Sequence, residues 1–172
     1  MKTIAAGLIL IACGCAKQQP AAQNPPSVGE EPWTLLATKN EQGQLVKLIR
    51  VCNTPRVPIS ENGFAWCTTL TLTYPESNAI GMPTPKQNNL LYAFEEKEID
   101  PLEPKQPTEL VSVSTGNNKR VLTFYSNTEK TLDALFTRLK KKYAVFGLDW
   151  QTAYDPTGTT YLGIRALIDE AD

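Results

Sequence analysis

The stretch that decides the fold of this chain runs from Trp66 to Trp150, and at its centre residues 81–87 read GMPTPKQ. Thr84 has the side chain of a helix N-cap, and Pro85 follows at the first helical position, where an N–H group is not needed. Gln87 stands three residues after the cap, as in a capping box, in which the two residues satisfy each other's backbone donors. The sequence therefore predicts a helix that begins at Pro85.

Strands and helices follow one another around this helix in an informative order. Residues 64–74 read FAWCTTLTLTY and alternate in a way that is typical of a half-buried strand. The other expected elements are a helix over 85–99, a strand over 109–115, a turn at 116–118, a strand over 119–125, a helix opened by a second capping box at 126–129, and a strand over 144–150. Strand, helix, strand, hairpin, strand, helix, strand is the split βαβ pattern of ferredoxin-like folds.

The segments on either side of this stretch complete the expected fold. Residues 33–39 and 44–52 are two β-rich runs joined by a short loop, which predicts a hairpin that extends the sheet at an edge or packs beside it. Residues 161–168 have apolar side chains at helical spacing, with a strand as the alternative. The predicted class is α+β, a two-layer α/β sandwich with a ferredoxin-like core and an extra N-terminal β-hairpin.

The spacing of apolar side chains predicts which face of each helix is buried. In the first helix the expected stripe holds Leu90, Leu91, Phe94 and Ile99, whereas residues 95–98 face mostly outward. In the second helix the stripe is formed by Leu132, Leu135, Phe136, Leu139 and Tyr143. The basic end of this helix is expected in solvent, where cations suit the helix dipole.

The amino terminus has the features of a secretion signal. Lys2 precedes an apolar run over residues 3–12 that is too short to span a bilayer as a helix. The run ends in Leu10-Ile11-Ala12-Cys13, which resembles a bacterial lipobox, the signal after which a cysteine becomes the lipidated first residue of the mature protein. Cys15 is the alternative lipidation site, and a plain secretory signal or a buried strand is the remaining interpretation.

The next residues have the composition of a tether. Residues 16–32 contain four prolines and a single bulky aliphatic residue, Val28, so they cannot bury enough surface to fold. The expected organisation is a lipoprotein signal peptide over 1–12, a flexible tether over 13–32 and an α/β domain over 33–172. Gly14 after Cys13 is not the Asp that retains lipoproteins at the inner membrane. That likeness implies a lipid-anchored protein of the outer membrane that faces the periplasm.

Composition excludes several classes of function. The chain has 17 Lys and Arg against 18 Asp and Glu, with no basic stripe, so nucleic-acid binding lacks electrostatic support. It contains no histidine, which removes the commonest general base, the usual catalytic triads and most zinc sites. Glycine-rich phosphate loops and nucleophile elbows are also missing. The sequence therefore assigns no catalytic residue, no metal site and no cofactor.

Two further cysteines form a disulfide candidate. Cys52 and Cys67 lie in strand-like segments on either side of one loop, and secreted proteins often bridge such pairs. Closing this loop would contribute about 3 kcal/mol by the chain-entropy model. Two buried thiols without a disulfide are the alternative.

Three patches of the sequence resemble a bacterial family known as a domain of unknown function, number 695. The patches are residues 81–84 with the helix end Phe94-Glu95-Glu96, the strand 122–126, and Asp155-Pro156 followed by Tyr161, and Trp33 stands where that family tends to open. The likeness covers roughly residues 33–165, although Thr157-Gly158 stands where members commonly have a Trp. The resemblance implies a ferredoxin-like α/β domain and carries no catalytic residue.

Three functions are compatible with these observations. The first is a membrane-tethered envelope lipoprotein with a non-catalytic binding or interaction domain, which meets the membrane through its lipid and has an envelope protein as a possible partner. The alternative is a carboxylate-dependent hydrolase or transferase of the cell envelope that uses Glu95, Glu96 and Asp155. The third is a structural or stress-related lipoprotein without a specific ligand.

Overall fold

The computed structural model describes residues 33–102 and 107–169. Its elements are β1 (Trp33–Lys39), β2 (Leu45–Cys52), β3 (Trp66–Thr73), α1 (Pro85–Phe94) with a π-helical turn (Glu95–Ile99), β4 (Thr108–Gly116), β5 (Lys119–Ser126), α2 (Asp133–Lys142), β6 (Gly147–Tyr154) and α3 (Thr159–Asp169). The predicted signal peptide, the tether and the lipidation sites Cys13 and Cys15 lie outside the described residues.

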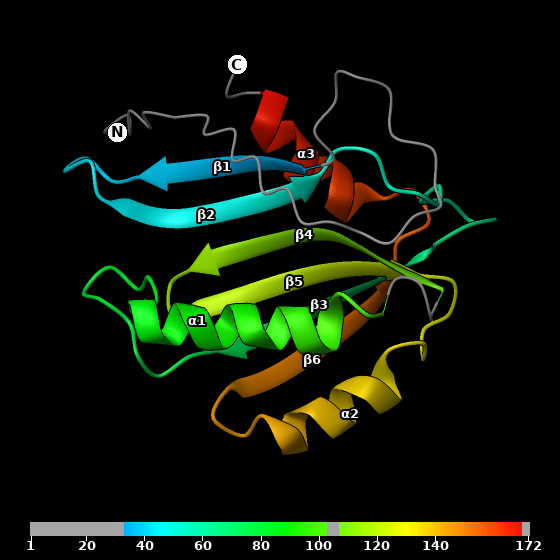
Figure 1. Ribbon diagram of the computed structural model, residues 1–172. Coiled ribbons are helices and arrows are strands. Elements are labelled where there is room, and N and C mark those ends of the chain that lie inside the picture. The colour runs from blue at the N-terminus through cyan, green and yellow to red at the C-terminus, as the bar shows by residue number, and fades with distance from the viewer. Residues whose placement is uncertain (1–32, 103–106, 170–172) are drawn as a thin grey trace, which may run out of the picture.

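Within the residues that the structure describes, the strands form one open sheet of six strands in the order β1-β2-β4-β5-β3-β6. Every neighbouring pair in this order is antiparallel. The N-terminal hairpin β1–β2 extends the sheet beside β4, as one of the two sequence alternatives predicted (Figure 1). Residues 33–102 and 107–169 therefore form a mixed α/β fold with an antiparallel sheet and three α-helices.

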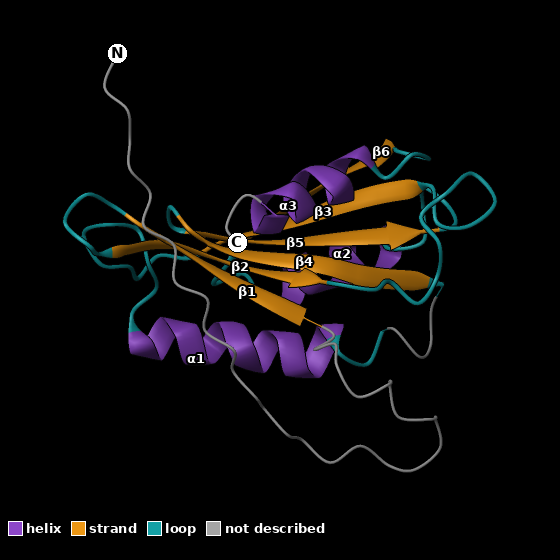
Figure 2. Cartoon of the chain, turned by 90° about the horizontal axis from the view of Figure 1, so that it is seen from above, coloured by secondary structure: helices purple, strands orange, loops and turns teal. Residues whose placement is uncertain are grey.

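The helices cover both faces of the sheet. Figure 2 shows α1 below the sheet and α3 above it, and Figure 1 shows α1 and α2 in front of the sheet with α3 behind. The prediction of two layers is therefore incomplete, because α3 adds a third layer over part of the far face. The reason is that Tyr161 and Ile168 of α3 are buried against apolar side chains of the β1, β2 and β4 half of the sheet.

The larger core lies between the sheet and helices α1 and α2. Leu70 and Leu72 of β3 are fully buried there, on the face that the alternation of this strand predicted. The other main members are Tyr74, Leu91, Phe94, Ile99, Leu110, Val113, Leu122, Phe124, Leu132, Leu135, Phe136, Leu139, Phe146 and Leu148. The smaller core, between the sheet and α3, holds Leu36, Ile49, Val51, Phe64, Cys67, Val111, Tyr125, Tyr161 and Ile168.

A β-bulge in β4 changes which of its residues face the larger core. Leu110 pairs with Phe124, but Ser112 pairs with Thr123, so Val111 is the additional residue. Leu110 and Val113 consequently both face the larger core, whereas simple alternation placed them on opposite faces. Val111 turns to the smaller core on the far face.

Helix α1 begins at Pro85 as predicted, but only half of the capping box forms. The Thr84 hydroxyl accepts a hydrogen bond from the Gln87 amide at 3.3 Å. The Thr84 amide, which the Gln87 side chain would bind in a full capping box, donates instead to the carbonyl of Glu76 at 3.3 Å. A backbone carbonyl of the preceding loop thus accepts the hydrogen bond that the Gln87 side chain was expected to accept.

Helix α2 buries its predicted stripe but begins later than predicted. Leu132, Leu135, Phe136 and Leu139 are buried in the larger core, and Tyr143 packs against it. The expected cap at Ser126 fails, because its hydroxyl donates to the carbonyl of Thr128 and α2 starts only at Asp133. The basic last turn of α2 is exposed, as expected.

The C-terminal elements also differ in their bounds. Strand β6 runs from Gly147 to Tyr154 rather than over 144–150, because it pairs with β3 along its whole length. The tail is a helix, α3, as the first of the two alternatives predicted. Asp155 accepts hydrogen bonds from the Thr159 and Thr160 amides at 2.8 and 2.9 Å, which caps this helix.

Candidate functional site

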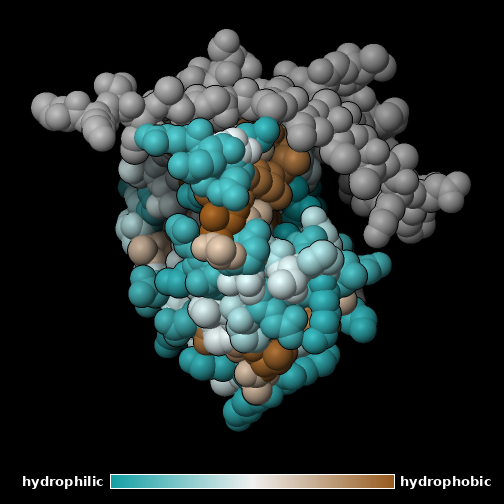
Figure 3. Space-filling model, turned by 90° about the vertical axis from the view of Figure 1, so that its left-hand side faces the viewer, coloured by the Kyte–Doolittle hydropathy of each residue, from teal (hydrophilic) through white to brown (hydrophobic). Residues whose placement is uncertain are grey.

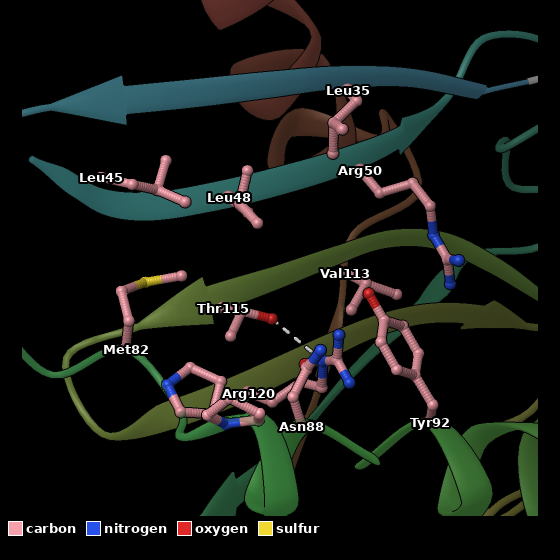
Figure 4. Close-up of a pocket in the computed structure, with 12 residues that line it drawn as sticks. Leu35, Leu45, Leu48, Arg50, Met82, Asn88, Tyr92, Val113, Thr115 and Arg120 are labelled. Atoms are coloured by element: carbon pink, nitrogen blue, oxygen red, sulfur yellow. Dashed lines mark hydrogen bonds between the residues drawn. The ribbon is translucent and has the colours of Figure 1, made fainter. Parts of the chain in front are cut away.

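A groove of about 420 Å³ lies between α1 and the β1–β2 end of the sheet, on the same face as the larger core. Figure 4 shows Leu45 and Met82 toward one end of this groove and Arg50 and Tyr92 toward the other. The lining residues are mostly apolar and comprise Leu35, Leu45, Leu48, Arg50, Met82, Pro83, Pro85, Asn88, Tyr92, Val113, Thr115 and Arg120. Its volume is in the range of small-molecule sites in proteins.

The sheet register places the floor of the groove. Arg50 of β2 pairs with Leu35 of β1 on one side and with Val113 of β4 on the other. Leu48 pairs with Thr115, which in turn pairs with Arg120 of β5. Because cross-strand partners point to the same face, these side chains stand in two adjacent rows beneath α1.

The loop before α1 holds the helix wall of the groove in place. The Gly81 carbonyl accepts hydrogen bonds from the Asn118 amide and from the Tyr74 hydroxyl, both at 2.8 Å. Gly81 has φ +79°, and a Cβ there would lie 2.9 Å from the Cα of Asn117. Only glycine allows the loop to approach the β4–β5 turn this closely. Met82 and Pro83 are thereby directed into the groove.

Three charged side chains meet at the polar end of the groove. An Arg50 Nη2 donates to Glu95 Oε2 at 2.9 Å, and Arg120 Nη1 lies 3.0 Å from Glu95 Oε1. The side chains of Glu95 and Arg120 are only 6% and 7% exposed, whereas that of Arg50 is 39% exposed. Arg120 is also held by its Nε, which donates to the Thr115 hydroxyl at 2.9 Å. Two cations share one anion, so this cluster carries a net positive charge.

Part of the hydrogen-bonding capacity of the cluster is unused among the described residues. Arg50 Nε and Arg120 Nη1 are buried atoms without a hydrogen bond, and so is Glu95 Oε1. The ion pair between Arg120 and Glu95 is therefore close but not aligned as a hydrogen bond. Buried donors without a hydrogen-bond partner are rare in proteins, because a protein group, a water or another bound group usually accepts from them.

Aromatic rings stack on both arginines. The Arg50 guanidinium lies 5.0 Å from the centre of the Trp33 ring, and the Arg120 guanidinium lies 4.9 Å from that of Tyr92. Such cation–π contacts hold a guanidinium in one orientation. The two arginines are thus fixed in place at the groove.

Glu95 occupies an inward position that helical spacing did not predict. The first helix was expected to bury Leu90 and expose Glu95, but Leu90 is 44% exposed and Glu95 only 5% exposed. The π-helical turn begins at Glu95, and its wider turn is closed by the Asp100 amide, which donates to the Glu95 carbonyl at 2.9 Å. Single π turns occur frequently at functional sites. The two arginines compensate for the burial of this carboxylate.

The three carboxylates that the sequence proposed for catalysis do not come together. Glu96 follows Glu95 but is exposed. Asp155 lies at the start of α3, where it accepts a hydrogen bond from the hydroxyl of Tyr125, a residue of the smaller core, at 2.6 Å. Glu95 belongs to the other face of the sheet, so it cannot share a substrate atom with Asp155.

The surroundings of Asp155 indicate a structural role. Burial disfavours the charged carboxylate, but the hydrogen bonds from Tyr125 and from the Thr160 and Thr159 amides outweigh it and lower the pKa of Asp155. Burial and the bond to Asp155 raise the pKa of the Tyr125 phenol. The Tyr161 amide donates to the Tyr125 hydroxyl at 3.2 Å, so this network ties α3 to β5.

The cysteines Cys52 and Cys67 are both buried and are not joined in a disulfide. The sheet order explains why the candidate bond does not form. Strands β4 and β5 lie between β2 and β3, which separates the two residues by three strand spacings, or roughly 14 Å. A disulfide needs Cα atoms within about 7 Å of each other. Burial raises the pKa of the Cys67 thiol, which keeps it protonated at neutral pH.

Within residues 33–102 and 107–169, no group of three or more Cys, Asp and Glu side chains is arranged to hold a metal ion. None of the helices in the same ranges has the length and the apolar character that crossing a membrane requires.

Sequence reasoning missed the arginines of the groove, although one signal for Arg120 was present. Arg120 shares its strand face with Leu122 and Phe124, which are buried, so alternation alone places a charge inside. A buried arginine demands an acidic partner. Nothing in the local sequence identifies Glu95 as that partner.

Comparison with known protein families identifies the family of this chain. A family model described as a family of unknown function (DUF695) matches residues 33–164. No curated protein and no solved structure matches the chain. The matched residues run from the first residue of β1 into α3, and they include every residue that lines the groove. The resemblance found in the sequence is thereby confirmed, and the chain belongs to the family of unknown function DUF695.

Proposed function

We propose that this protein is a lipid-anchored lipoprotein of the bacterial cell envelope and that its folded domain is a non-catalytic binding domain. The groove beside α1 is the proposed binding site. The observation that carries this proposal is the combination of an apolar lining with two oriented arginines at one end. Sites for small ligands typically combine apolar walls with a few fixed polar groups.

The surface view supports a binding role for this part of the molecule. Figure 3 views the left-hand side of Figure 1, where β1 ends and β2 begins, and hydrophobic side chains are visible there between hydrophilic ones. Apolar surface rimmed by polar groups is a common feature of ligand and partner sites. An envelope component that reaches the tethered domain is the partner that this proposal requires.

The groove supports binding better than carboxylate catalysis. Both carboxylate oxygens of Glu95 already contact an arginine, Oε2 with Arg50 at 2.9 Å and Oε1 with Arg120 at 3.0 Å, so neither is free to face a substrate. The chain has no histidine to take over proton transfer. A hydrolase or transferase would therefore need a general base from elsewhere, and for this reason we do not adopt that alternative.

We also infer that the part of the chain from β3 to β6 is a split βαβ core of the ferredoxin-like kind. The strand order β4-β5-β3-β6 with antiparallel neighbours supports this inference, as do α1 and α2 on one face. The β1–β2 hairpin then adds two strands beside β4 and provides half of the groove floor. Since such folds host many activities, the fold by itself does not specify a ligand.

The lipid anchor rests on the lipobox-like residues that end at Cys13. We expect Cys13→Ser to abolish labelling of the full-length chain by a metabolic acyl tag and to leave a soluble or unprocessed precursor, because the thiol is the acylated group. The matched control is Cys15→Ser, which should keep full labelling. The reverse pattern, with label lost only in Cys15→Ser, would move the modification site by two residues.

The groove can be tested with an anionic dye whose fluorescence rises on apolar surfaces, anilinonaphthalenesulfonate. We expect Leu48→Glu in the full, unlipidated chain to remove most of the dye signal that depends on the folded state, because it places a charge on the apolar floor. Leu162→Glu is the matched control, since Leu162 is 58% exposed on α3, on the other side of the sheet. Dye bound to the N-terminal segment is common to both variants and cancels in the comparison.

Both variants must first show the same cooperative melt as the parent chain. If Leu48→Glu and Leu162→Glu then bind the dye equally well, the groove is not a binding site. The proposal would also fail if the dye bound only to unfolded protein.

A further inference from the structure

We infer that the groove binds a small amphipathic carboxylate with a single apolar chain. In this arrangement the carboxylate meets Arg50 and Arg120, and the chain lies over Leu48 and Leu45 toward Met82. The inference rests on the proposed binding function of the groove and adds the chemical class of the ligand.

The polarity of the groove changes in one direction along β2. Leu45 and Leu48 come first, and Arg50 follows on the same side of the sheet. Leu45 and Arg50 are five steps apart along the strand, which is roughly 16 Å of extended backbone and long enough to separate an apolar end from a charged end. Figure 4 shows the same order, with Leu45 and Met82 toward one end of the groove and Arg50 and Tyr92 toward the other. A ligand that matches the groove is therefore apolar over most of its length and polar at one end.

The charge at the polar end favours an anion. Glu95 neutralises only one of the two arginines that it contacts. Arg120 lines the groove with a side chain that is 7% exposed, and its Nη1 makes no hydrogen bond among the described residues. Arg50 also lines the groove, and its side chain is 39% exposed, so its guanidinium is accessible to a ligand. A carboxylate can accept hydrogen bonds from a guanidinium through both of its oxygens, which suits donors that already have fixed orientations.

An extended peptide fits this groove less well than a simple chain. The floor of the groove is the face of the sheet, and the strands β2 and β4 at its centre are paired with each other, so the floor offers no free backbone edge to a peptide. Only the polar side chains of the lining could then bind the peptide groups, and these are Arg50, Asn88, Tyr92, Thr115 and Arg120. Buried peptide groups without hydrogen bonds cost free energy at every residue, whereas an alkyl chain has no polar group to satisfy.

Calorimetric titration of the full, unlipidated chain with decanoate, decanol and butyrate tests this inference. Decanoate has both the chain and the carboxylate, decanol lacks the carboxylate, and butyrate lacks most of the chain. We expect decanoate to bind more tightly than either of the other two. Arg50→Met should weaken decanoate binding by roughly tenfold to a hundredfold, because a charged hydrogen bond is lost while the side-chain volume is largely kept.

The matched control is Lys86→Met, which removes the same charge from the first turn of α1. The Lys86 side chain is 76% exposed and pairs with Glu76 outside the groove lining. We expect this variant to bind decanoate within about twofold of the parent chain, since long-range charge effects are screened by salt. Both variants are compared only after their melts match that of the parent chain.

The other outcomes separate the ligand class from the proposed function. Equal binding of decanol and decanoate, with no effect of Arg50→Met, would overturn the carboxylate but leave the groove as a binding site. No decanoate binding, while Leu48→Glu still abolishes the dye signal, would overturn the whole ligand class. Binding to anionic phospholipid vesicles that depends on Arg50, without binding of decanoate, would show a bilayer lipid instead and would also overturn it. If Leu48→Glu and Leu162→Glu bind the dye equally well, the proposed function itself is rejected.

Discussion

Replacing Glu95 by Gln should lower the free energy of unfolding by about 3–5 kcal/mol, because it leaves a buried arginine without its counter-charge. The Glu95 carboxylate is 6% exposed and contacts Arg50 at 2.9 Å and Arg120 at 3.0 Å. Arg50 is 39% exposed and can turn toward water once the carboxylate is gone. Arg120 is 7% exposed and cannot, so most of the loss comes from this residue.

Denaturant melts of Glu95→Gln and Glu96→Gln measure this effect against a matched control. The two substitutions are chemically identical and adjacent in sequence, but Glu96 is exposed. We expect the control to change stability by no more than about 0.5 kcal/mol. The double replacement Glu95→Leu with Arg120→Met should recover most of the loss, because a buried ion pair is often replaceable by apolar side chains of similar size.

Two results would contradict this account of Glu95. Equal and small effects of the two single substitutions would mean that the carboxylate is hydrated in solution. A double variant that is less stable than Glu95→Gln would mean that Arg120 stabilises the fold through Thr115 or Tyr92 rather than through Glu95.

Phe136→Ala should also cost about 3–5 kcal/mol, in this case through a cavity in the larger core. Phe136 is fully buried in the middle of the α2 stripe. Its ring centre lies 5.7 Å from that of Phe124 in β5 and 5.9 Å from that of Trp150 in β6. Removing the ring therefore separates α2 from two strands at once, and a loss of this size is a large part of the stability of a small domain.

The same denaturant melts test this prediction, with Lys141→Ala on the exposed face of α2 as the control. The control should stay within about 0.5 kcal/mol of the parent chain. If both substitutions proved equally mild, α2 would not be packed on the sheet, and the arrangement of the larger core would be wrong.

Several features of the fold could be predicted because they depend on local sequence. The cap at Thr84 and Pro85 specifies where α1 begins, since the hydrogen bond that it makes spans only three residues. The alternation of β3 and the spacing of the α2 stripe predicted their buried faces, because strand and helix geometry repeats every few residues. The resemblance to DUF695 was also visible in short patches of sequence.

Other predictions failed where a distant contact or a local irregularity changed the geometry. The bulge at Val111 reversed the faces of β4 beyond it, and a bulge leaves no reliable trace in alternation. The cap expected at Ser126 was lost because its hydroxyl donates to the carbonyl of Thr128. Cys52 and Cys67 are not joined in a disulfide in the structure. They are close along the chain, but their strands β2 and β3 are not neighbours in the sheet.

By itself, the sequence determined the kinds of elements, their order and most of their buried faces, because these follow from interactions between residues a few positions apart. The groove and its charged end were decided by the tertiary structure alone. Arg50 and Glu95 are 45 residues apart in the chain, and they meet only because the sheet order places β2 beside β4 and beneath α1. Glu95 faces inward because a π-helical turn starts at this residue. Its buried carboxylate is stabilised by ion pairs with Arg50 and Arg120 on the sheet. The free energy of such a pairing depends on burial and on distance in space, and neither quantity can be read from the local sequence.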